Sequence, residues 1–552
     1  MTKPPRPRTG GRRPCGRYTA MTGALAGLAV LAACAGPPNG GAGSAGSFAL
    51  SAGTPRAAGA IDSFSWAVYA EPPTLDYTVA FDYPQNTILS NVCESLMRWT
   101  PGLTVEPGLA RRATNPDPTT WVYDLREGVR FHDGRTMSAD DVVFSLQRQR
   151  DPDNAAAWAQ MFQNVTAVTR TGPLQVTVEL KRPDSQFPQY MATAAGVVAS
   201  RAGVEKAGRD YGTTGGLACT GPYRLRAWHK GQALELERFE DYRGARPKAA
   251  AVVFRFLTDP SARTNALLSG EVDGGYLIPT ESYARLRGSG AGTLYFGEGL
   301  STVNVSITNL KGPLGDLRVR RALSLALDRT GFVKAGLGGA GNPTGSLTTR
   351  AAWAGTPQAT RKAAFDGLPP AEADLDRARE LIEEAGATGA KLTVATSSIG
   401  QDVSLLATAV QAAGTQIGLD IRLKSIAPNA FTALFTDPGA REGIDMFPLT
   451  YYNSITDPLD LLANFKTGAY LNFAGHSDKK FDEGVARATA EYDPGRRAGI
   501  VAKLQQHAAE RLLWIPVAEW PTSVFLNRRI TGAPTTIAYL YYPWAADVGA
   551  AP

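Results

Sequence analysis

The chain is poor in histidine, which limits the chemistry that it can perform. Its histidines are scattered without the spacing of metal ligands, at His132, His229, His476 and His507. There is no His-Glu-x-x-His motif, no Gly-x-Ser-x-Gly motif and no phosphate-loop lysine. These absences argue against zinc, serine and nucleotide hydrolases. We therefore expect a protein that is not an enzyme and that holds no metal and no cofactor.

Beyond its first residues the chain also lacks an excess of charge of either sign. The formal net charge is +6, but residues 1–33 contain no acid and carry Lys3, Arg6, Arg8, Arg12, Arg13 and Arg17. Removing these from the 57 lysines and arginines leaves 51, which equals the 51 aspartates and glutamates. A neutral body creates no broad field for nucleic acid or anionic lipid, so we expect no nucleic-acid partner.

The N-terminal apolar run, 20–33, is too short to span a bilayer, which needs about 20 apolar residues. It follows the basic segment and ends in Leu31-Ala32-Ala33-Cys34. This order is typical of export signals, and we predict a signal peptide over 1–33. Its end resembles the bacterial lipobox, which implies a lipid on Cys34 that anchors the protein to the extracytoplasmic face of the cell membrane. The alternative is an ordinary signal peptide with an incidental cysteine.

Cysteine is rare as well, with four residues in the chain. Cys15 falls in the predicted signal peptide and Cys34 is the predicted lipid site, which leaves Cys93 and Cys219. Two remaining thiols in an oxidising compartment are expected to pair. We predict a disulfide between Cys93 and Cys219, with two buried free thiols as the alternative.

After the leader, residues 34–60 are mostly Gly, Ala, Ser and Pro, and we predict a lipidated flexible tether there. The body that follows contains both strand and helix patterns. Alternating apolar residues predict strands at 63–69, 120–125 and 176–180. Amphipathic helices are predicted from Ser138, over 318–328 and over 374–385. Strands and helices intermix and no repeat of 20–50 residues is visible, which indicates an α/β fold.

Seven segments carry a family resemblance. The most specific is Trp121–Gly134 with the following Ala139–Val142. The others, in order, are Glu71–Asp76, Thr220–Tyr223, Asp241-Tyr242, Leu268–Asp273, Arg318–Leu323 and Glu384–Gly386. In this order they resemble the family 5 extracellular solute-binding proteins of bacteria, the oligopeptide, dipeptide and nickel binders of ABC importers. The resemblance covers nearly all of the chain after the tether.

This resemblance implies a two-lobed, periplasmic-binding-protein-like fold (type II, class C), with a hinge and a ligand cleft between the lobes. We place lobe I at 61–305, with 523–552 returning to it, and lobe II at 306–522. The crossovers are then expected near 303–305 and 515–517. We expect a monomer that hands a small solute to an ABC permease and ATPase complex. A signalling role without a permease is the alternative.

The ligand expected from the resemblance is peptide-like. In peptide-binding relatives, a lobe II aspartate four residues before the proline of an Asp-Pro element pairs with the peptide α-amino group. Ser454 takes that position here. A buried ammonium without a carboxylate would cost several kcal/mol, so either Asp457 or Asp460 substitutes or the ligand presents no free amine there.

A strict dipeptide binder is disfavoured. Dipeptide binders hold the peptide carboxylate with an arginine in the segment that corresponds to 395–404, and this segment contains no arginine. Longer or modified peptides, opine-like compounds and sugars therefore stay open. Nickel or haem binding has little support from so few histidines, and a secreted enzyme is a distant alternative.

The predicted ligand-binding residues come from two parts of the family pattern, the first turn and the segment around Ser454. They are Glu71, Asp76, Tyr451, Tyr452, Asn453, Ser454 and Asp457. The two tyrosines stand where relatives often turn aromatic residues toward the cleft, and the alternative is that both pack inside lobe II.

Overall fold

A computed structural model describes residues 48–552 of the chain. The predicted signal peptide 1–33, the predicted lipid site Cys34 and the first part of the predicted tether lie outside the described residues.

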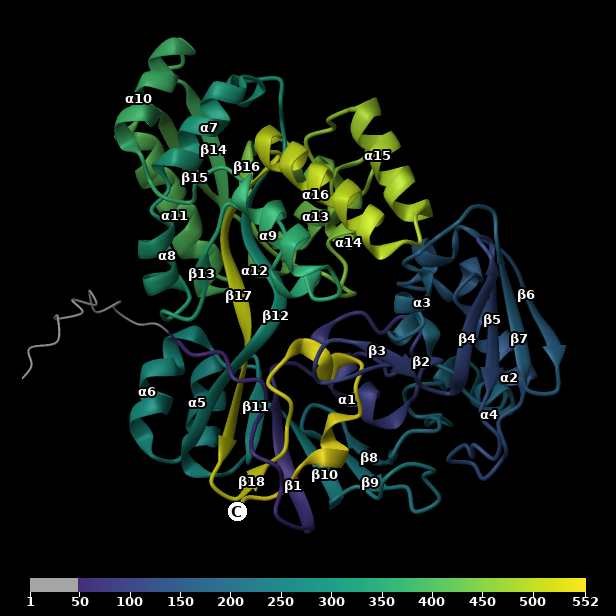
Figure 1. The fold of residues 1–552 in the computed structure, drawn as a ribbon. Coiled ribbons are helices and arrows are strands. Elements are labelled where there is room, and N and C mark those ends of the chain that lie inside the picture. The colour runs from purple at the N-terminus through teal and green to yellow at the C-terminus, as the bar shows by residue number, and fades with distance from the viewer. Residues whose placement is uncertain (1–47) are drawn as a thin grey trace, which may run out of the picture. The chain divides into compact units, whose positions relative to one another are not determined.

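One large mixed sheet of eleven strands runs through the described part of the chain (Figure 1). Its order is β15–β14–β16–β12–β17–β11–β1–β10–β9–β8, and the short β13 pairs with β17. We call β11, β1, β10, β9 and β8 the β1 end of the sheet, and β16, β14 and β15 the β14 end. The bounds are β1 Ile61–Val68, β8 Tyr223–His229, β9 Ala233–Arg238, β10 Ala249–Phe256, β11 Gly274–Tyr276, β13 Asn342–Pro343, β14 Lys391–Thr396, β15 Asp420–Ser425 and β16 Met446–Tyr452.

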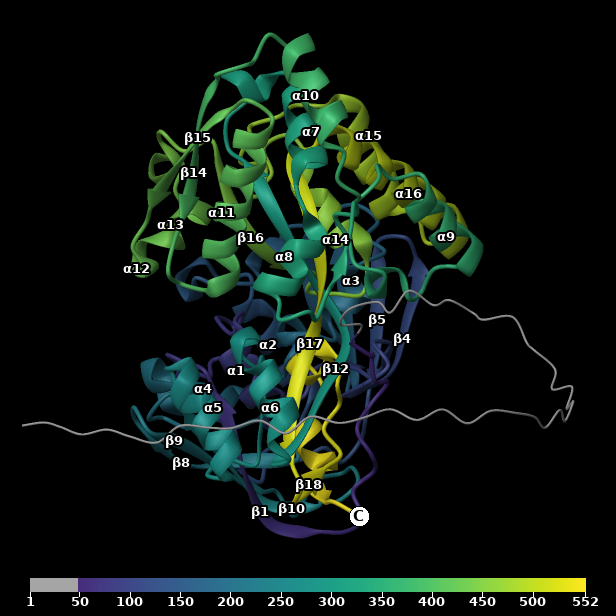
Figure 2. The same cartoon turned by 90° about the vertical axis from the view of Figure 1, so that its left-hand side faces the viewer.

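The two longest strands, β12 (Gly292–Ile307) and β17 (Trp514–Asn527), link the two ends. They pair antiparallel with each other, while 301–307 also pair with β16 and 524–526 pair with β11. Figures 1 and 2 show them passing side by side between two groups of elements. Their register shifts between Gly297 and Ser301. A second shift falls between Val303 and Asn304, within the segment of β12 that pairs with β16 on one side and β17 on the other.

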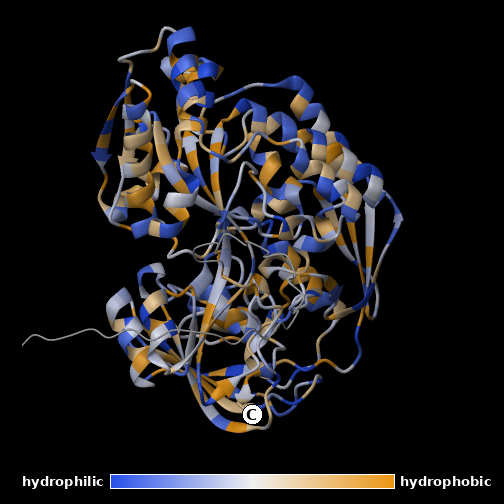
Figure 3. Ribbon diagram, turned by 60° about the vertical axis from the view of Figure 1, so that its left-hand side comes forward, coloured by the Kyte–Doolittle hydropathy of each residue, from blue (hydrophilic) through white to orange (hydrophobic). Residues whose placement is uncertain are grey.

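Helices cover the β14 end because each presents an apolar stripe to the sheet. A core that includes Val305, Leu323, Leu406 and Met446 joins this sheet end to α7, α8, α10 and α11. In Figure 3 hydrophobic residues gather where helices face the strands, and hydrophilic residues mark the outer surface. The helices of this half are α7 Leu317–Ala326, α8 Arg329–Gly336, α9 Gln358–Asp366, α10 Leu375–Glu384, α11 Gln401–Gln416, α12 Pro428–Phe431, α13 Ala433–Thr436, α14 Pro458–Leu462, α15 Lys479–Ala490 and α16 Pro494–Arg511.

The β1 end carries a second, antiparallel sheet of order β4–β5–β7–β6. The predicted strands at 120–125 and 176–180 are β5 and β7 of this sheet, and the helix predicted from Ser138 is α2. Ser138 and Asp141 form a reciprocal cap at the start of α2, so the sequence itself predicts where this helix begins. The remaining elements are α1 Tyr83–Val92, β2 Met97–Trp99, β3 Val105–Pro107, β4 Ala110–Asp117, β5 Thr120–Leu125, α2 Ala139–Arg148, β6 Val165–Gly172, β7 Gln175–Leu180, α3 Phe187–Tyr190, α4 Arg201–Ala207, α5 Pro260–Ser269, α6 Tyr283–Ser289, β18 Ile530–Thr531 and β19 Gly549–Ala550.

The described part of the predicted tether, 48–60, is bound to the body. The backbone N–H of Ser51 donates to the carbonyl of Phe296 at 2.6 Å, and that of Ala58 donates to Ala550 at 2.8 Å. The Thr54 hydroxyl donates to the carbonyl of Ala533 at 2.8 Å. Small side chains allow this close backbone approach, so the composition that indicated a free linker also fits a segment laid along the C-terminal part of the chain.

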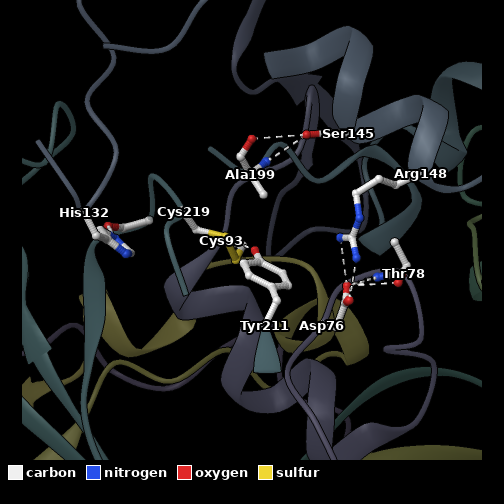
Figure 4. The surroundings of a disulfide bond; sticks show 10 residues. Asp76, Thr78, Cys93, His132, Ser145, Arg148, Ala199, Tyr211 and Cys219 are labelled. Atoms are coloured by element: carbon white, nitrogen blue, oxygen red, sulfur yellow. Dashed lines mark hydrogen bonds and ion pairs between the residues drawn. A yellow bond between two sulfur atoms is a disulfide. The ribbon is translucent and has the colours of Figure 1, made fainter. Parts of the chain in front are cut away.

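The structure joins Cys93 and Cys219 in a disulfide (Figure 4), with their Cα atoms 4.8 Å apart. Cys93 caps the C-terminus of α1, and Cys219 is fully buried. The bond closes a loop across a sequence separation of 126 residues. In the chain-entropy model a loop of this length stabilises the folded protein by about 5 kcal/mol.

Candidate ligand-binding site

A cavity of about 480 Å³ lies between the β1 end and the β14 end of the sheet. Both ends and both crossing strands line it, with Tyr69, Arg263, Ser301, Asp402, Tyr452 and Trp520 among the lining residues. A hollow of about 780 Å³ is larger, but only residues from within 132–237 line it. Small-molecule sites favour cavities between lobes that have aromatic walls and a few polar groups. The cavity between the two ends is therefore the candidate site.

Tyr452 is the one predicted ligand-binding residue that lines this cavity. It ends β16, and its hydroxyl donates to the carbonyl of Phe81 at 2.9 Å across to the β1 end. Its ring centroid lies 5.0 Å from that of Tyr83, which also lines the cavity. Tyr452 thus contacts both halves of the molecule at the wall of the site.

Tyr451, Asn453 and Ser454 take structural positions instead. Side chains alternate along a strand, so Tyr451 points away from the cavity. Its ring centroid lies 5.8 Å from that of Trp514. The Asn453 amide donates to the carbonyl of Asp457 at 2.9 Å. Ser454 is 5% exposed, and its backbone N–H donates to the carboxylate of Asp460 at 2.8 Å.

The carboxylates of Asp457 and Asp460 are both engaged within the protein. Asp457 lies 2.6 Å from the Arg497 guanidinium and accepts from the backbone N–H of Leu459 at the start of α14. Asp460 accepts from the hydroxyl of Tyr190 at 3.0 Å. Burial raises the pKa of Asp460 to about 7. Neither residue lines the cavity, so neither takes the place that the resemblance gave to Ser454.

Glu71 and Asp76, expected in the cleft, are held by partners distant in sequence. Glu71 accepts from the indole of Trp228 at 2.8 Å and from a backbone N–H of the β8–β9 hairpin. Asp76 pairs with Arg148 at 2.7 Å and accepts from Thr78 (Figure 4). Both carboxylates stabilise the part of the protein around the β1 end of the sheet, and neither lines the candidate site.

Sequence reasoning missed the charged residues of the cavity, Arg263, Glu281 and Asp402. Arg263 on α5 is 7% exposed, and its Nε has no hydrogen-bond partner among the described residues. Burial lowers the pKa of the Arg263 guanidinium and raises that of the Asp402 carboxyl at the start of α11. The sequence carries no clear signal for Arg263, because an arginine on a short helix usually faces solvent, and only the structure shows that it is buried with Thr264 and Ala266.

The cavity wall also holds a backbone strain. Leu277 lines the cavity with a φ of +52°, a left-handed conformation that residues other than glycine rarely adopt. Such conformations cost free energy and concentrate at ligand sites. Leu277 and its neighbour Ile278 both line the cavity at this turn of the chain.

Comparison with known proteins gives the family. Residues 104–472 match the family described as bacterial extracellular solute-binding proteins, family 5, middle part. The chain belongs to this family. It is also 27% identical over 477 residues to the glutathione-binding protein GsiB of Salmonella paratyphi A, which covers 84% of this chain and 90% of the relative. The GsiB of Escherichia coli K12 is 26% identical over the same length.

Solved structures show the same fold. The substrate-binding protein CtaP of Listeria monocytogenes superposes with a TM-score of 0.78 at 22% identity and covers 89% of this chain and 100% of CtaP. DppA of Helicobacter pylori, in complex with the peptide STSA, gives 0.76 at 20% identity and covers 90% and 99%. As a family 5 solute-binding protein, the chain is the substrate-binding component of an ABC importer with a two-lobed α/β fold.

The relatives that match are solute-binding proteins and not enzymes. Within 48–552 no cluster of three or more His, Cys, Asp or Glu side chains could hold a metal ion. Over the same range no helix combines the length and the apolar character needed to cross a membrane.

Proposed function

We propose that this family 5 protein captures a peptide-like solute in the cavity between its two halves and delivers it to an ABC permease. The observation that carries the proposal is the cavity itself, which both sheet ends and both crossing strands line. A ligand that contacts both halves at once stabilises the closed form, which a permease can distinguish from the open form. The glutathione-binding relatives support a small peptide-like solute.

The two halves are the proposed lobes. Lobe I takes in 61–305 and 523–552, and lobe II takes in 306–522, with the movement centred on the register shift between Gly297 and Ser301. We further propose that a lipid on Cys34 holds a monomeric protein on the outer face of the cell membrane. The support is the lipobox-like Leu31-Ala32-Ala33-Cys34 after a short apolar run.

A non-peptide, opine-like solute is the second candidate. It is favoured by the absence of a free carboxylate near Ser454, because Asp457 and Asp460 both have partners within the protein. The fold also occurs in AgaA, solved in complex with agropinic acid, at a TM-score of 0.73.

Native mass spectrometry of the purified protein with mixed peptides of two to eight residues tests the proposal. We expect a selected peptide whose binding is lost in Thr450→Trp, which fills the cavity, and kept in Thr408→Trp, which lies exposed on α11. Circular dichroism verifies that both variants fold. If folded wild-type protein selects no peptide, the peptide-like proposal is wrong and opine-like compounds are tested next.

A further inference from the structure

Arg263 is a buried cation that forms no ion pair and no side-chain hydrogen bond with the described residues, although the charge of Glu281, which lines the same cavity, acts on it from a greater distance. Its side chain belongs to a residue that is 7% exposed, and its Nε lacks a hydrogen-bond partner within 48–552. The ring of Tyr69, 5.9 Å from its guanidinium carbon, is a weak substitute for an anion. An unpaired buried charge is strongly destabilising. We therefore expect a ligand in the cavity to supply the anion that pairs with Arg263.

The position of Arg263 indicates which anion that is. It projects from α5 in the β1 half into the wall of the interlobe cavity. On the β14 half, Asp402 lines the same cavity from the start of α11. The site therefore presents the buried Arg263 and the exposed Glu281 on one wall and Asp402 on the other. Arg263, which has no ion-pair partner, and the facing Asp402 are together complementary to a zwitterion.

We propose that Arg263 binds a carboxylate of the transported solute and that Asp402 faces its ammonium group. This inference rests on the proposed function and specifies its substrate class as a zwitterionic, peptide-like compound. The planar guanidinium can hold a carboxylate through two parallel hydrogen bonds, a geometry that a lysine cannot reproduce. A solute that pairs with both walls joins the two lobes directly.

The arrangement differs from the one that the family resemblance assigns to dipeptide binders. Those proteins place the carboxylate-binding arginine in the segment equivalent to 395–404. Here that segment carries Asp402, and the arginine lies on the facing wall. The carboxylate of the solute is therefore held from lobe I, while the carboxylate that faces its ammonium group stays in lobe II.

The test compares each compound with its neutralised form. Glutathione and a set of tripeptides are titrated calorimetrically into the purified protein, each as the free acid, with its carboxylates amidated, and with its amine acetylated. We expect the free acids to bind, and Arg263→Gln to weaken them by about 10- to 150-fold, the range for hydrogen bonds to a charged group. The matched control is Arg285→Gln, an exposed arginine on α6, which should leave affinity unchanged.

Further readouts separate a ligand role from a structural one. Arg263→Gln should abolish the preference for acid over amide and should not lower the melting temperature of the unliganded protein. If Arg263→Gln fails to fold, Arg263→Lys, which keeps the charge, should bind with intermediate affinity. Asp402→Asn should abolish the preference for free over acetylated amines.

Three results would overturn the inference. If the wild-type protein binds the acid and amide forms equally, Arg263 does not bind a carboxylate of the solute, and the proposed function stays intact. Unchanged affinity in Arg263→Gln leads to the same conclusion. If no compound binds in any form, the proposed function fails, and the inference that rests on it fails too.

Discussion

Asp460 should make the free energy of unfolding fall as the pH rises. Its side chain is buried, accepts from Tyr190 and from the backbone N–H of Ser454, and has no cation within ion-pair distance among the described residues. Burial raises its pKa from 3.8 to about 7. Between these values the folded protein holds a proton that the unfolded chain has lost, so the folded state loses stability as the pH rises through this window.

The size of the effect follows from the shift. At about 1.4 kcal/mol per pKa unit, the full cost well above pH 7 is about 4 kcal/mol, of which about 2 kcal/mol develops between pH 5 and pH 7. Asp460→Asn cannot ionise and keeps one of the two acceptor oxygens that receive hydrogen bonds from Tyr190 and Ser454. The loss of the other hydrogen bond lowers the unfolding free energy equally at every pH, so the pH dependence isolates the ionisation. Relative to wild type, this variant should gain about 3 kcal/mol of unfolding free energy when the pH goes from 5 to 8.

Urea denaturation at pH 5 and pH 8 measures this difference, because wild type and variant share all other titrating groups. The matched control is Asp376→Asn, whose side chain is 93% exposed and which should show no comparable pH-dependent gain. A wild-type-to-variant difference that is the same at both pH values would refute the assignment of a protonated, buried Asp460.

Other predictions concern the cysteines and Asp457, which is paired with Arg497. Replacing Cys93 and Cys219 together by serine should lower the unfolding free energy by about 5 kcal/mol, measured in urea; unchanged stability would contradict the chain-entropy estimate. Cys34→Ser should move the protein from the membrane to the soluble fraction, whereas Cys15→Ser should not; retention of the first variant in the membrane would disprove the lipid site. Asp457→Ala should lower the unfolding free energy by about 3–5 kcal/mol, because a buried cation loses its partner, and leave the ligand affinity of the folded fraction unchanged. Lost calorimetric binding at unchanged stability would instead make Asp457 a ligand residue.

Local signals in the sequence predicted the elements whose causes are local. The alternation at 120–125 and the cap at Ser138 depend on neighbouring residues, and both elements appear where they were expected. The family order of motifs likewise led to the correct fold, because each motif marks a turn or a helix start that the fold requires.

The binding residues were harder to predict because their partners are remote. Glu71 is held by a residue 157 positions away, and Asp76 by one 72 positions away. Tyr451 and Tyr452 are the same residue type, and only the alternation of side chains along the strand decides which of them lines the cavity. Arg263 resembles any solvated helix residue in sequence, since charged side chains are seldom buried.

The pairing of β12 with β17 restricts how the two lobes can move. Sliding one strand along the other by a single residue would turn every side chain to the opposite face, so translation along the strands is blocked. Rotation about an axis near the register shift disturbs only a few ladder bonds. Gly297 at this shift lies against the carbonyl of Thr535, where a Cβ atom would come within 2.2 Å. We therefore expect the proposed lobes to open mainly by rotation about this region, so that each wall would meet the solute in the same orientation at every closure.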